Sequence, residues 1–240
     1  MFDGSLDSLR VKIFADGADL EGMVKMASEP WVAGLTTNPT LMRKAGVTNY
    51  VRFAQEVLER IPHLPVSFEV FSDEFGEMRR QAEMIGSWGS NVYVKVPVTN
   101  TKGDSSSLLI RSLSNDGVRL NVTALTQAHQ VKAVAECLVP GVPAIISVFA
   151  GRVADTGRDP VPLMRECLGA IGDNRSAELL WASPRELLNL IQADAIGCHI
   201  ITMTNELLSK VGIIGRDLDA YSLDTVKMFH QDAMAAGFKL

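Results

Sequence analysis

The chain has 240 residues, of which 47% are hydrophobic and 21% are charged, with 19 glycines and 10 prolines. These proportions are typical of a folded globular protein and exclude a largely disordered, collagen-like or coiled-coil chain. The formal net charge of −5 disfavours partners held by general attraction to a basic surface, so we expect neither nucleic-acid nor membrane binding.

Three widely spaced cysteines, Cys137, Cys167 and Cys198, form no Cys-x-x-Cys pair. They indicate neither a disulfide framework nor a zinc site, and they suit a reducing compartment. The chain starts with an acidic segment that lacks the apolar core of a secretory signal, and no uncharged apolar stretch approaches about 18 residues. We therefore expect a cytoplasmic protein. Four scattered histidines fit no metal spacing and no nucleotide-binding glycine loop occurs, so we expect no metal and no cofactor.

Eight short runs of β-branched or apolar residues recur along the chain and are predicted to be strands. They are Val11–Ala15, Ala33–Thr37, Val66–Val70, Asn91–Val96, Val118–Thr123, Ala144–Val148, Glu178–Ala182 and Cys198–Met203. Apolar residues spaced i, i+3 and i+4 predict helices over residues 75–88 and, less regularly, 163–170. Ser183-Pro184-Arg185-Glu186 matches a capping box with proline at the first helical position, which predicts a helix start. A last helix is expected at about residues 222–236.

Alternating strands and helices indicate parallel strands joined by right-handed crossovers. Eight units in 240 residues correspond to 30 residues each, which matches the α/β fold of the (β/α)8 TIM barrel. A doubly wound open sheet is the alternative, but it normally carries a glycine-rich turn after its first strand, and none is present. No linker divides the chain, so we expect one barrel domain over residues 1–240.

In such a barrel, alternate strand residues point inward and functional groups gather at the carboxyl ends of the strands. Near the ends of seven strands, residues two apart share a face, and most pairs include a polar side chain. The pairs are Phe14/Asp16, Thr36/Asn38, Ser67/Glu69, Tyr93/Lys95, Asn121/Thr123, Ser147/Phe149 and Trp181/Ser183. We expect these side chains to converge on one mouth of the barrel, with apolar neighbours such as Val94 and Ala182 facing the helices.

Lys95 is the most informative of these residues because it interrupts the apolar run Val-Tyr-Val-Lys-Val-Pro-Val. A buried ammonium group is costly unless it is paired, and two interpretations are open. In the first, Lys95 forms an ion pair with Glu69 or Asp16 that fills the barrel. In the second, Lys95 is a nucleophilic amine that forms a Schiff base with a carbonyl substrate, and Asp16 and Glu69 are acid/base groups.

Six motifs at these strand ends carry a family resemblance. They are Ala-Asp-Gly-Ala-Asp (15–19), Gly-Leu-Thr-Thr-Asn-Pro-Thr (34–40), Phe-Glu-Val (68–70), Val-Lys-Val-Pro-Val-Thr (94–99), Leu-Asn-Val-Thr (120–123) and Ser-Val-Phe-Ala-Gly-Arg (147–152). Through them the chain resembles the transaldolase family, whose broader group includes the fructose-6-phosphate aldolases. The resemblance runs from the first strand to about Ser183 and continues more weakly to the end. It implies a cofactor-free class I transaldolase that acts on sugar phosphates.

By this resemblance, Lys95 forms an imine with the C2 ketone of a ketose phosphate. Asp16 takes the proton of the C4 hydroxyl as the C3–C4 bond breaks, and the electrons form an enamine on Lys95. The aldehyde leaves, and a second aldehyde enters to build a new ketose. Glu69 and Thr123 hold a water that shuttles protons. The substrate-binding residues implied are Asn38, Asn121 and Ser147 for the dihydroxyacetone part, with Thr37 and Phe149 completing the set.

Two positions bear on the branch of the family. By this resemblance, the aldolase branch has Gln and Tyr at the positions that match Glu69 and Phe149, so these two residues favour a transaldolase. Two alternatives remain open: a fructose-6-phosphate-type aldolase, which is a lyase, and a non-catalytic barrel that binds sugar phosphates. The resemblance also implies a homo-oligomer, with residues 221–240 as the expected contact.

The phosphate end departs from the family pattern. Arg152 matches an arginine implied to bind the sugar phosphate, a role that suits its guanidinium fork. The family usually carries a second basic residue shortly after the serine that Ser183 matches, whereas Pro184 and Arg185 follow here directly. Ser183 and Arg185 are therefore either phosphate ligands or a helix cap and a solvated first-turn residue. Asp155 belongs to a charged loop that is either solvated or orients Arg152 by an ion pair.

Overall fold

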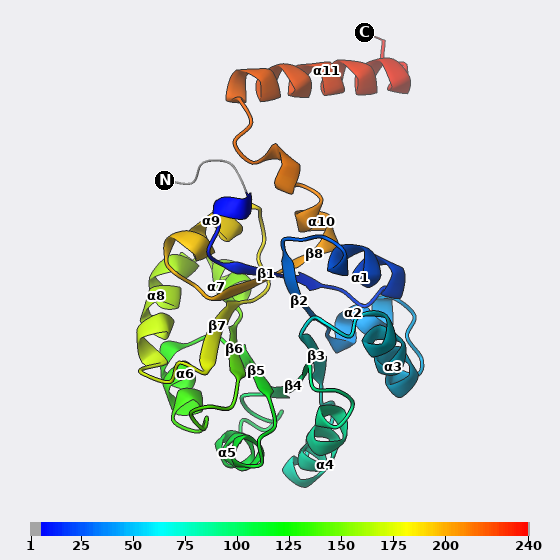
Figure 1. Ribbon diagram of the computed structural model, residues 1–240. Helices are drawn as coiled ribbons and strands as arrows, with labels where there is room; N and C mark the ends of the chain where they lie inside the picture. Colours follow the sequence, from blue (N-terminus) through cyan, green and yellow to red (C-terminus); the bar gives the residue numbers. More distant parts are fainter. Residues whose placement is uncertain (1–5, 240) are drawn as a thin grey trace.

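Residues 6–239 are described by a computed structural model in which eight parallel strands close into a barrel in chain order (Figure 1). The strands are β1 (Lys12–Asp16), β2 (Val32–Thr36), β3 (Val66–Glu69), β4 (Val92–Pro97), β5 (Leu120–Leu125), β6 (Ala144–Val148), β7 (Ala177–Trp181) and β8 (Ile200–Thr204). Every predicted strand is present to within two residues at either end, and the predicted (β/α)8 fold is confirmed. Residues 1–5, on which the expectation of no secretory signal rests, lie outside the described part of the chain.

Helices surround the barrel. They are α1 (Leu20–Ala27), α2 (Pro39–Lys44), α3 (Tyr50–Arg60), α4 (Phe75–Gly86), α5 (Ser107–Asn115), α6 (Ala128–Ala135), α7 (Ala150–Ala154), α8 (Pro160–Ala170), α9 (Leu188–Ala195) and α10 (Asn205–Leu208), with 3-10 turns η1 (Leu6–Ser8) and η2 (Val211–Ile213). A last helix, α11 (Leu218–Ala236), stands apart from the barrel (Figure 1). It begins four residues before the expected start because the Asp217 side chain caps it by accepting from the Ala220 N–H.

The prediction that a helix starts at Ser183 is wrong. Ser183 has a left-handed φ of 56°, which is uncommon outside glycine, and α9 begins only at Leu188. The side-chain oxygen of Asn189 accepts hydrogen bonds from the backbone N–H groups of Arg185 and Glu186, at 2.8 and 3.2 Å. These bonds hold the segment after β7 as a loop, so Ser183 is not a helix cap.

Two apolar cores support the barrel. The larger one lies between the sheet and the helices, and a smaller one inside the barrel contains Phe14, Ile145, Leu180, Ala182 and Ile200. Gly34 on β2 makes room for it, since a Cβ there would lie 2.5 Å from the ring of Phe14. We call this inner cluster the apolar plug of the barrel.

A second prediction is wrong, namely that Trp181 on strand β7 points into the barrel and Ala182 toward the helices. Leu180 and Ala182 face the interior of the barrel, whereas Trp181 is fully buried in the outer core. The prediction that Trp181 and Ser183 share a face assumed an extended strand through Ser183, but the backbone turns at that residue. Ser183 therefore follows Ala182 into the mouth, while the indole packs outside.

Candidate active site

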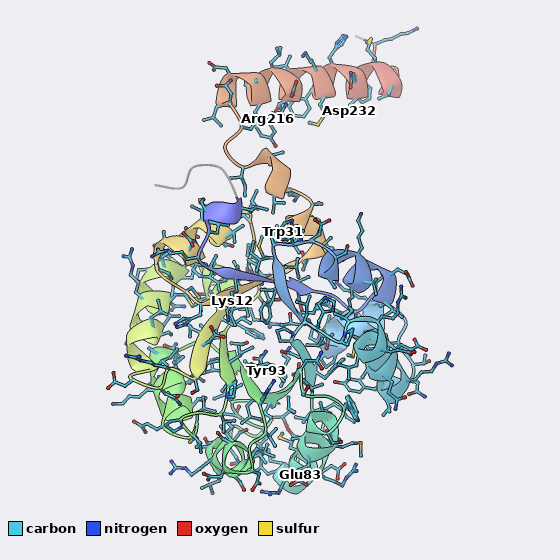
Figure 2. All side chains as sticks on the ribbon, in the orientation of Figure 1. Lys12, Trp31, Glu83, Tyr93, Arg216 and Asp232 are labelled. Atoms are coloured by element: carbon cyan, nitrogen blue, oxygen red, sulfur yellow. The ribbon has the colours of Figure 1, made fainter. Side chains whose placement is uncertain are left out.

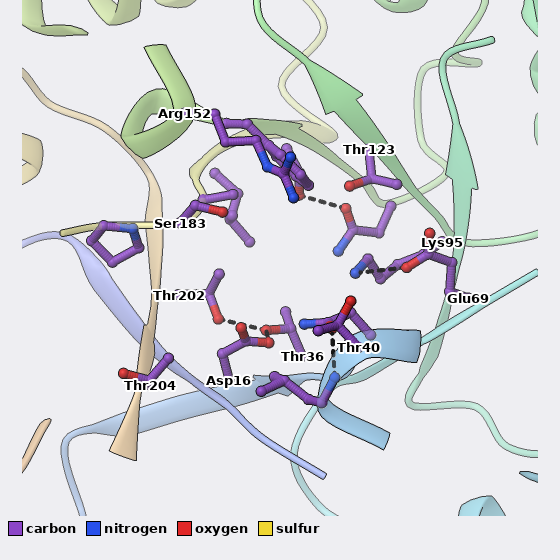
Figure 3. A pocket seen from close by; sticks show the side chains of 18 of the residues that line it. Asp16, Thr36, Thr40, Glu69, Lys95, Thr123, Arg152, Ser183, Thr202 and Thr204 are labelled. Atoms are coloured by element: carbon purple, nitrogen blue, oxygen red, sulfur yellow. Dashed lines mark hydrogen bonds and ion pairs between the residues drawn. The ribbon is translucent and has the colours of Figure 1, made fainter. Parts of the chain in front are cut away.

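A cavity of about 390 Å³ opens at the carboxyl ends of the strands. Figure 3 shows Lys95 with Glu69 on one side of it, Asp16 with Thr36 on a second side, and Arg152 and Ser183 across from them. The predicted site residues that line it are Asp16, Asn38, Glu69, Lys95, Asn121, Thr123, Ser147, Phe149, Arg152, Ser183 and Arg185. The structure thus brings together side chains from most of the strand ends, as the alternation of residues along the strands predicts.

Lys95 on β4 is buried at the base of the cavity, with 9% of its side chain exposed. Its Nζ lies 3.1 Å from Oε2 of Glu69, the residue paired with it on β3, and donates to the carbonyl of Thr37 at 2.8 Å. The Thr37 side chain is fully buried and donates to the carbonyl of Ser67. Thr37 therefore contacts the site through its backbone and lies outside the cavity lining.

The backbone of Glu69 is held by the hydroxyl of Tyr50, which extends from α3. This hydroxyl donates to the Glu69 carbonyl and accepts from the Glu69 N–H, both at 2.8 Å. The paired registers of β2 and β3 end at Thr36 and Ser67, so the Tyr50 hydroxyl takes the place of a strand neighbour at Glu69. Burial raises the pKa of Tyr50, which keeps the hydroxyl protonated and able to donate.

Asp16 at the end of β1 is the second carboxylate of the site. Thr36 Oγ1 donates to its Oδ1 at 2.7 Å, and Thr36 is in turn 2.5 Å from the hydroxyl of Thr202 on β8. Burial raises the pKa of Asp16 above its ordinary value, while the charge of Lys95 and hydrogen bonds from Thr36 and Asn38 oppose that rise. A carboxylate whose pKa is raised is a stronger base than an exposed one, which suits proton abstraction.

A chain of buried polar groups crosses the floor of the cavity. Ser147 Oγ donates to Asn121 Oδ1 at 2.6 Å, and Asn121 Nδ2 donates to Ser67 Oγ at 3.0 Å. These bonds fix the Asn121 amide in one orientation. The buried hydroxyl of Thr123 has no hydrogen-bond partner among the described residues. An unpaired buried hydroxyl is costly, and Thr123 lines the cavity, so a polar group of a ligand there would satisfy it.

The opposite wall joins the ends of β6 and β7. The N–H of Gly151 donates to the carbonyl of Ala182 at 3.3 Å, and a Cβ on Gly151 would lie 1.5 Å from the Ser183 carbonyl oxygen. Only glycine permits this approach, which places α7 against the loop that carries Ser183. Arg152, the next residue, lies over the ring of Phe149 with Cζ 5.4 Å from the centroid, a cation–π contact.

Arg185 is engaged by Asp155. Its Nε and Nη2 lie 2.8 and 2.5 Å from the two oxygens of the Asp155 carboxylate. Asp155 is exposed, as expected of a solvated loop, but its ion-pair partner is Arg185, so the interpretation that it pairs with Arg152 is wrong. The ion pair also holds the Arg185 side chain at the cavity, since Arg185 is among the lining residues.

Several lining residues were not predicted. Thr202 and Thr204 on β8 face the cavity, and the alternation in Ile-Ile-Thr-Met-Thr (200–204) was a signal for them of the kind used on the other strands. Thr40 on α2 also lines the cavity. Tyr50 had no such signal, since it reaches Glu69 from a helix.

Two features are missing from residues 6–239. No group of three or more His, Cys, Asp or Glu side chains in this part of the chain could hold a metal ion. No helix in it is both long and apolar enough to cross a bilayer.

Comparisons with known proteins agree with the motifs. The model of the transaldolase/fructose-6-phosphate aldolase family matches residues 13–240. A probable transaldolase of Dehalococcoides mccartyi is 32% identical over 202 residues, which are 84% of this chain and 90% of that one. A probable transaldolase of Maridesulfovibrio salexigens is 29% identical over 223 residues, 91% of this chain and 99% of that one.

Solved structures with similar folds are more distant in sequence. The chain superposes on dihydrodipicolinate synthase from Rhodopseudomonas palustris with a TM-score of 0.57, over 97% of this chain and 82% of that one, at 14% identity. The TM-score is 0.59 for a putative phosphonomutase from Burkholderia cenocepacia, over 95% of this chain and 97% of that one, at 10% identity. These two likenesses concern the fold alone. The family match and the curated relatives confirm the resemblance seen in the motifs, and the chain belongs to the transaldolase/fructose-6-phosphate aldolase family.

Proposed function

We propose that this protein is a transaldolase that transfers a dihydroxyacetone unit from a ketose phosphate to an aldose acceptor through a Schiff base on Lys95. The observation that carries the proposal is the position of Lys95. Its amine is buried, lines the cavity, and is held by Glu69 and the Thr37 carbonyl. A lysine that only filled the barrel would have no need of an open cavity beside its amine.

The surrounding groups have separate roles in this reaction. Glu69 Oε2, 3.1 Å from Nζ, takes the amine proton, so that Nζ adds to the C2 ketone; loss of water then leaves the imine. Asp16 removes the C4 hydroxyl proton, the C3–C4 bond breaks, and its electron pair forms the enamine. Asn121 and Ser147 hydrogen-bond the three-carbon unit, and Arg152 and Arg185 bind the phosphate.

The first test is borohydride reduction in the presence of fructose 6-phosphate, followed by intact mass and peptide mapping. The expected product carries one reduced adduct, on Lys95, and Lys95→Ala has none. Lys102→Ala is the matched control, since Lys102 lies in the loop after the same strand and is exposed, and it should be trapped like the wild type. A folded wild-type protein with no adduct would instead favour a barrel that binds without catalysis or uses another donor.

An isotope-exchange experiment distinguishes transfer of the dihydroxyacetone unit from simple cleavage of the ketose phosphate. Labelled glyceraldehyde 3-phosphate should exchange into fructose 6-phosphate without release of free dihydroxyacetone, because a transferase keeps the enamine until an aldehyde returns. A lyase releases dihydroxyacetone at the rate of aldehyde formation. Glu69 and Phe149, which by resemblance mark the transaldolase branch, support the first outcome. Dihydroxyacetone release that matches aldehyde formation would identify the lyase.

We also propose a homo-oligomer that covers α11. No residue of this helix is buried, and Leu218, Val226 and Phe229 are all more than 60% exposed. Figure 2 shows its side chains, Asp232 among them, with no other element of the chain beside them. A helix with apolar residues on several faces is normally covered, and most of the stability of helices in proteins comes from such packing. A second copy is the partner that the family resemblance implies.

Light scattering after gel filtration tests this assembly. The wild type should be larger than a monomer, and Val226→Lys/Phe229→Lys should be smaller. Leu108→Lys is the control, because Leu108 on α5 is also apolar and is even more exposed than Val226 and Phe229, but is distant from α11 in sequence. A monomeric wild type would contradict the proposal.

We place the protein in the cytoplasm. Cys137, Cys167 and Cys198 are free thiols and all three are buried, which suits a reducing compartment. Detection in a cytosolic fraction of the source cells would test this, and recovery with membranes or secreted material would contradict it.

A further inference from the structure

The ion pair between Asp155 and Arg185 joins two loops at the phosphate end of the cavity. Asp155 follows α7, three residues after Arg152, while Arg185 lies in the loop after β7. Both oxygens of the carboxylate are used, one on Nε and one on Nη2 of the guanidinium. Such paired contacts fix both the distance and the plane of an arginine.

Only one member of this ion pair faces the cavity. Arg185 lines it together with Arg152, whereas Asp155 does not. The bidentate contact uses the Nε–H and one N–H of Nη2, so the two N–H groups of Nη1 and the second N–H of Nη2 are left to donate to a ligand. Asp155 therefore lies behind Arg185 and affects a ligand mainly through its charge.

The net charge of the side chains at this end of the cavity is less than the +2 of its two arginines. Arg152 and Arg185 contribute two cations, and Asp155 subtracts one at hydrogen-bond distance from the second. Both arginines act on the carboxylate: the Arg185 hydrogen bond is the main cause that lowers the pKa of Asp155, and the Arg152 charge lowers it further. Asp155 is thus ionised at neutral pH and close to both cations, and the net charge offered to a dianionic phosphate is about one.

We propose that Asp155 sets the selectivity of this enzyme for phosphorylated over unphosphorylated sugars. By pairing with Arg185 it weakens the attraction for a terminal phosphate, so sugars with an uncharged end compete better than they would at a site with two free arginines. This inference rests on the proposed function only in taking a sugar phosphate as the ligand.

The test measures binding without catalysis. Sorbitol 6-phosphate has no carbonyl and cannot form an imine, so calorimetry reports the Kd of non-covalent binding alone. Asp155→Asn keeps the shape and one acceptor oxygen but removes the charge. It should bind sorbitol 6-phosphate about three- to tenfold more tightly than the wild type, as expected for one nearby charge in a partly solvated site. Unphosphorylated sorbitol should show no change, and the gain should shrink in high salt.

The matched control is Glu186→Gln, which removes a charge from the exposed residue next to Arg185. Its Kd for sorbitol 6-phosphate should stay within about twofold of the wild type. In an Arg185→Gln background, Asp155→Asn should lose most of its gain, because the partner through which it acts is absent. If Asp155→Asn unfolds, Asp155→Ser carries the same prediction.

Three results would overturn the inference. They are weaker binding by Asp155→Asn, an equal gain in Glu186→Gln, and no measurable binding of sorbitol 6-phosphate by any variant. Weaker binding would mean that Asp155 serves to orient Arg185. The borohydride test is independent of these results: an adduct on Lys95 with an unchanged Kd in Asp155→Asn refutes only this inference. A tighter Kd without any adduct refutes only the proposed function.

Discussion

Gly151→Ala should damage both the stability of the barrel and the end of the cavity lined by Arg152 and Arg185. A Cβ at this position would lie 1.5 Å from the carbonyl oxygen of Ser183 and 2.6 Å from its carbonyl carbon. Side-chain carbons essentially never approach other atoms closer than 3.0 Å. The obstacle is backbone rather than a flexible side chain, so α7 and the loop after β7 must separate by more than an ångström.

The cost follows from what this separation breaks. The hydrogen bond from the Gly151 N–H to the Ala182 carbonyl is lost, at about 0.5–1.5 kcal/mol. Displacement of packed neighbours adds about 1–3 kcal/mol. We expect Gly151→Ala to lower the free energy of unfolding by about 1.5–4.5 kcal/mol. Because Arg152 and Arg185 lie on the two separated segments, binding of sorbitol 6-phosphate should weaken as well.

Urea denaturation followed by circular dichroism measures the first effect, and calorimetry measures the second. Gly169→Ala is the control: Gly169 lies exposed on α8, and a Cβ there would meet no atom within 4 Å. Since alanine is the better helix former, Gly169→Ala should be neutral or stabilise by up to about 1 kcal/mol. If Gly151→Ala unfolds at the wild-type urea concentration, the close approach of α7 to Ser183 does not constrain this protein.

Three further substitutions probe the ends of the barrel. Asp16→Asn should stabilise the fold at pH 7, because burial raises the pKa of Asp16 and the ionised carboxylate therefore opposes folding above that pKa. The advantage of Asn should fade as the pH falls toward 3.8, the ordinary pKa of an Asp side chain. Urea titrations at pH 7 and at the lower pH measure both effects. An Asn variant less stable than wild type at pH 7 would show that the charge of Lys95 outweighs burial. Tyr50→Phe leaves the N–H and carbonyl of Glu69 without the hydroxyl partner and should cost about 1–3 kcal/mol, with slower adduct formation in single-turnover trapping; unchanged trapping would deny Tyr50 a positioning role. Glu178→Gln, at the amino end of the barrel, should cost no more than about 1 kcal/mol of stability and leave borohydride trapping intact. The reason is that the side chains of its ion pair, Lys12 and Glu178, are 43% and 33% exposed. A loss of several kcal/mol would show that this ion pair holds the barrel closed.

The strands were predictable because parallel barrel strands are covered on both faces. A run such as Ala-Ile-Ile-Ser-Val (144–148) is apolar almost throughout, and turn-forming segments separate it from its neighbours. The helix start at Ser183 was not predictable, although the local pattern was a good capping box. Asn189 binds the backbone of the same segment, and this competing contact is invisible in a four-residue motif.

The residues of the candidate site likewise include some that the sequence predicts and some that it does not. Asp16, Glu69 and Lys95 could be found because each is a charged residue at a position where alternation requires an inward side chain. Tyr50 could not, since its hydroxyl bonds to a backbone 19 residues away. The pairing of Asp155 with Arg185 spans 30 residues and two loops, and loop conformation is decided by contacts that no strand period records.

The two ends of the barrel differ in how much the burial of their polar groups costs, and this difference marks the carboxyl end as the candidate site. Between them lies an apolar plug, and at the amino end Lys12 and Glu178 form a partly exposed ion pair, which costs little. The carboxyl end instead holds a buried amine, a carboxylate whose pKa is raised, and a hydroxyl without a partner among the described residues. Burial of such groups opposes folding, and the whole set surrounds one cavity. The ion pair with Glu69 and the open cavity are therefore compatible: the pair makes burial of the Lys95 amine tolerable, and the cavity leaves that amine facing open space.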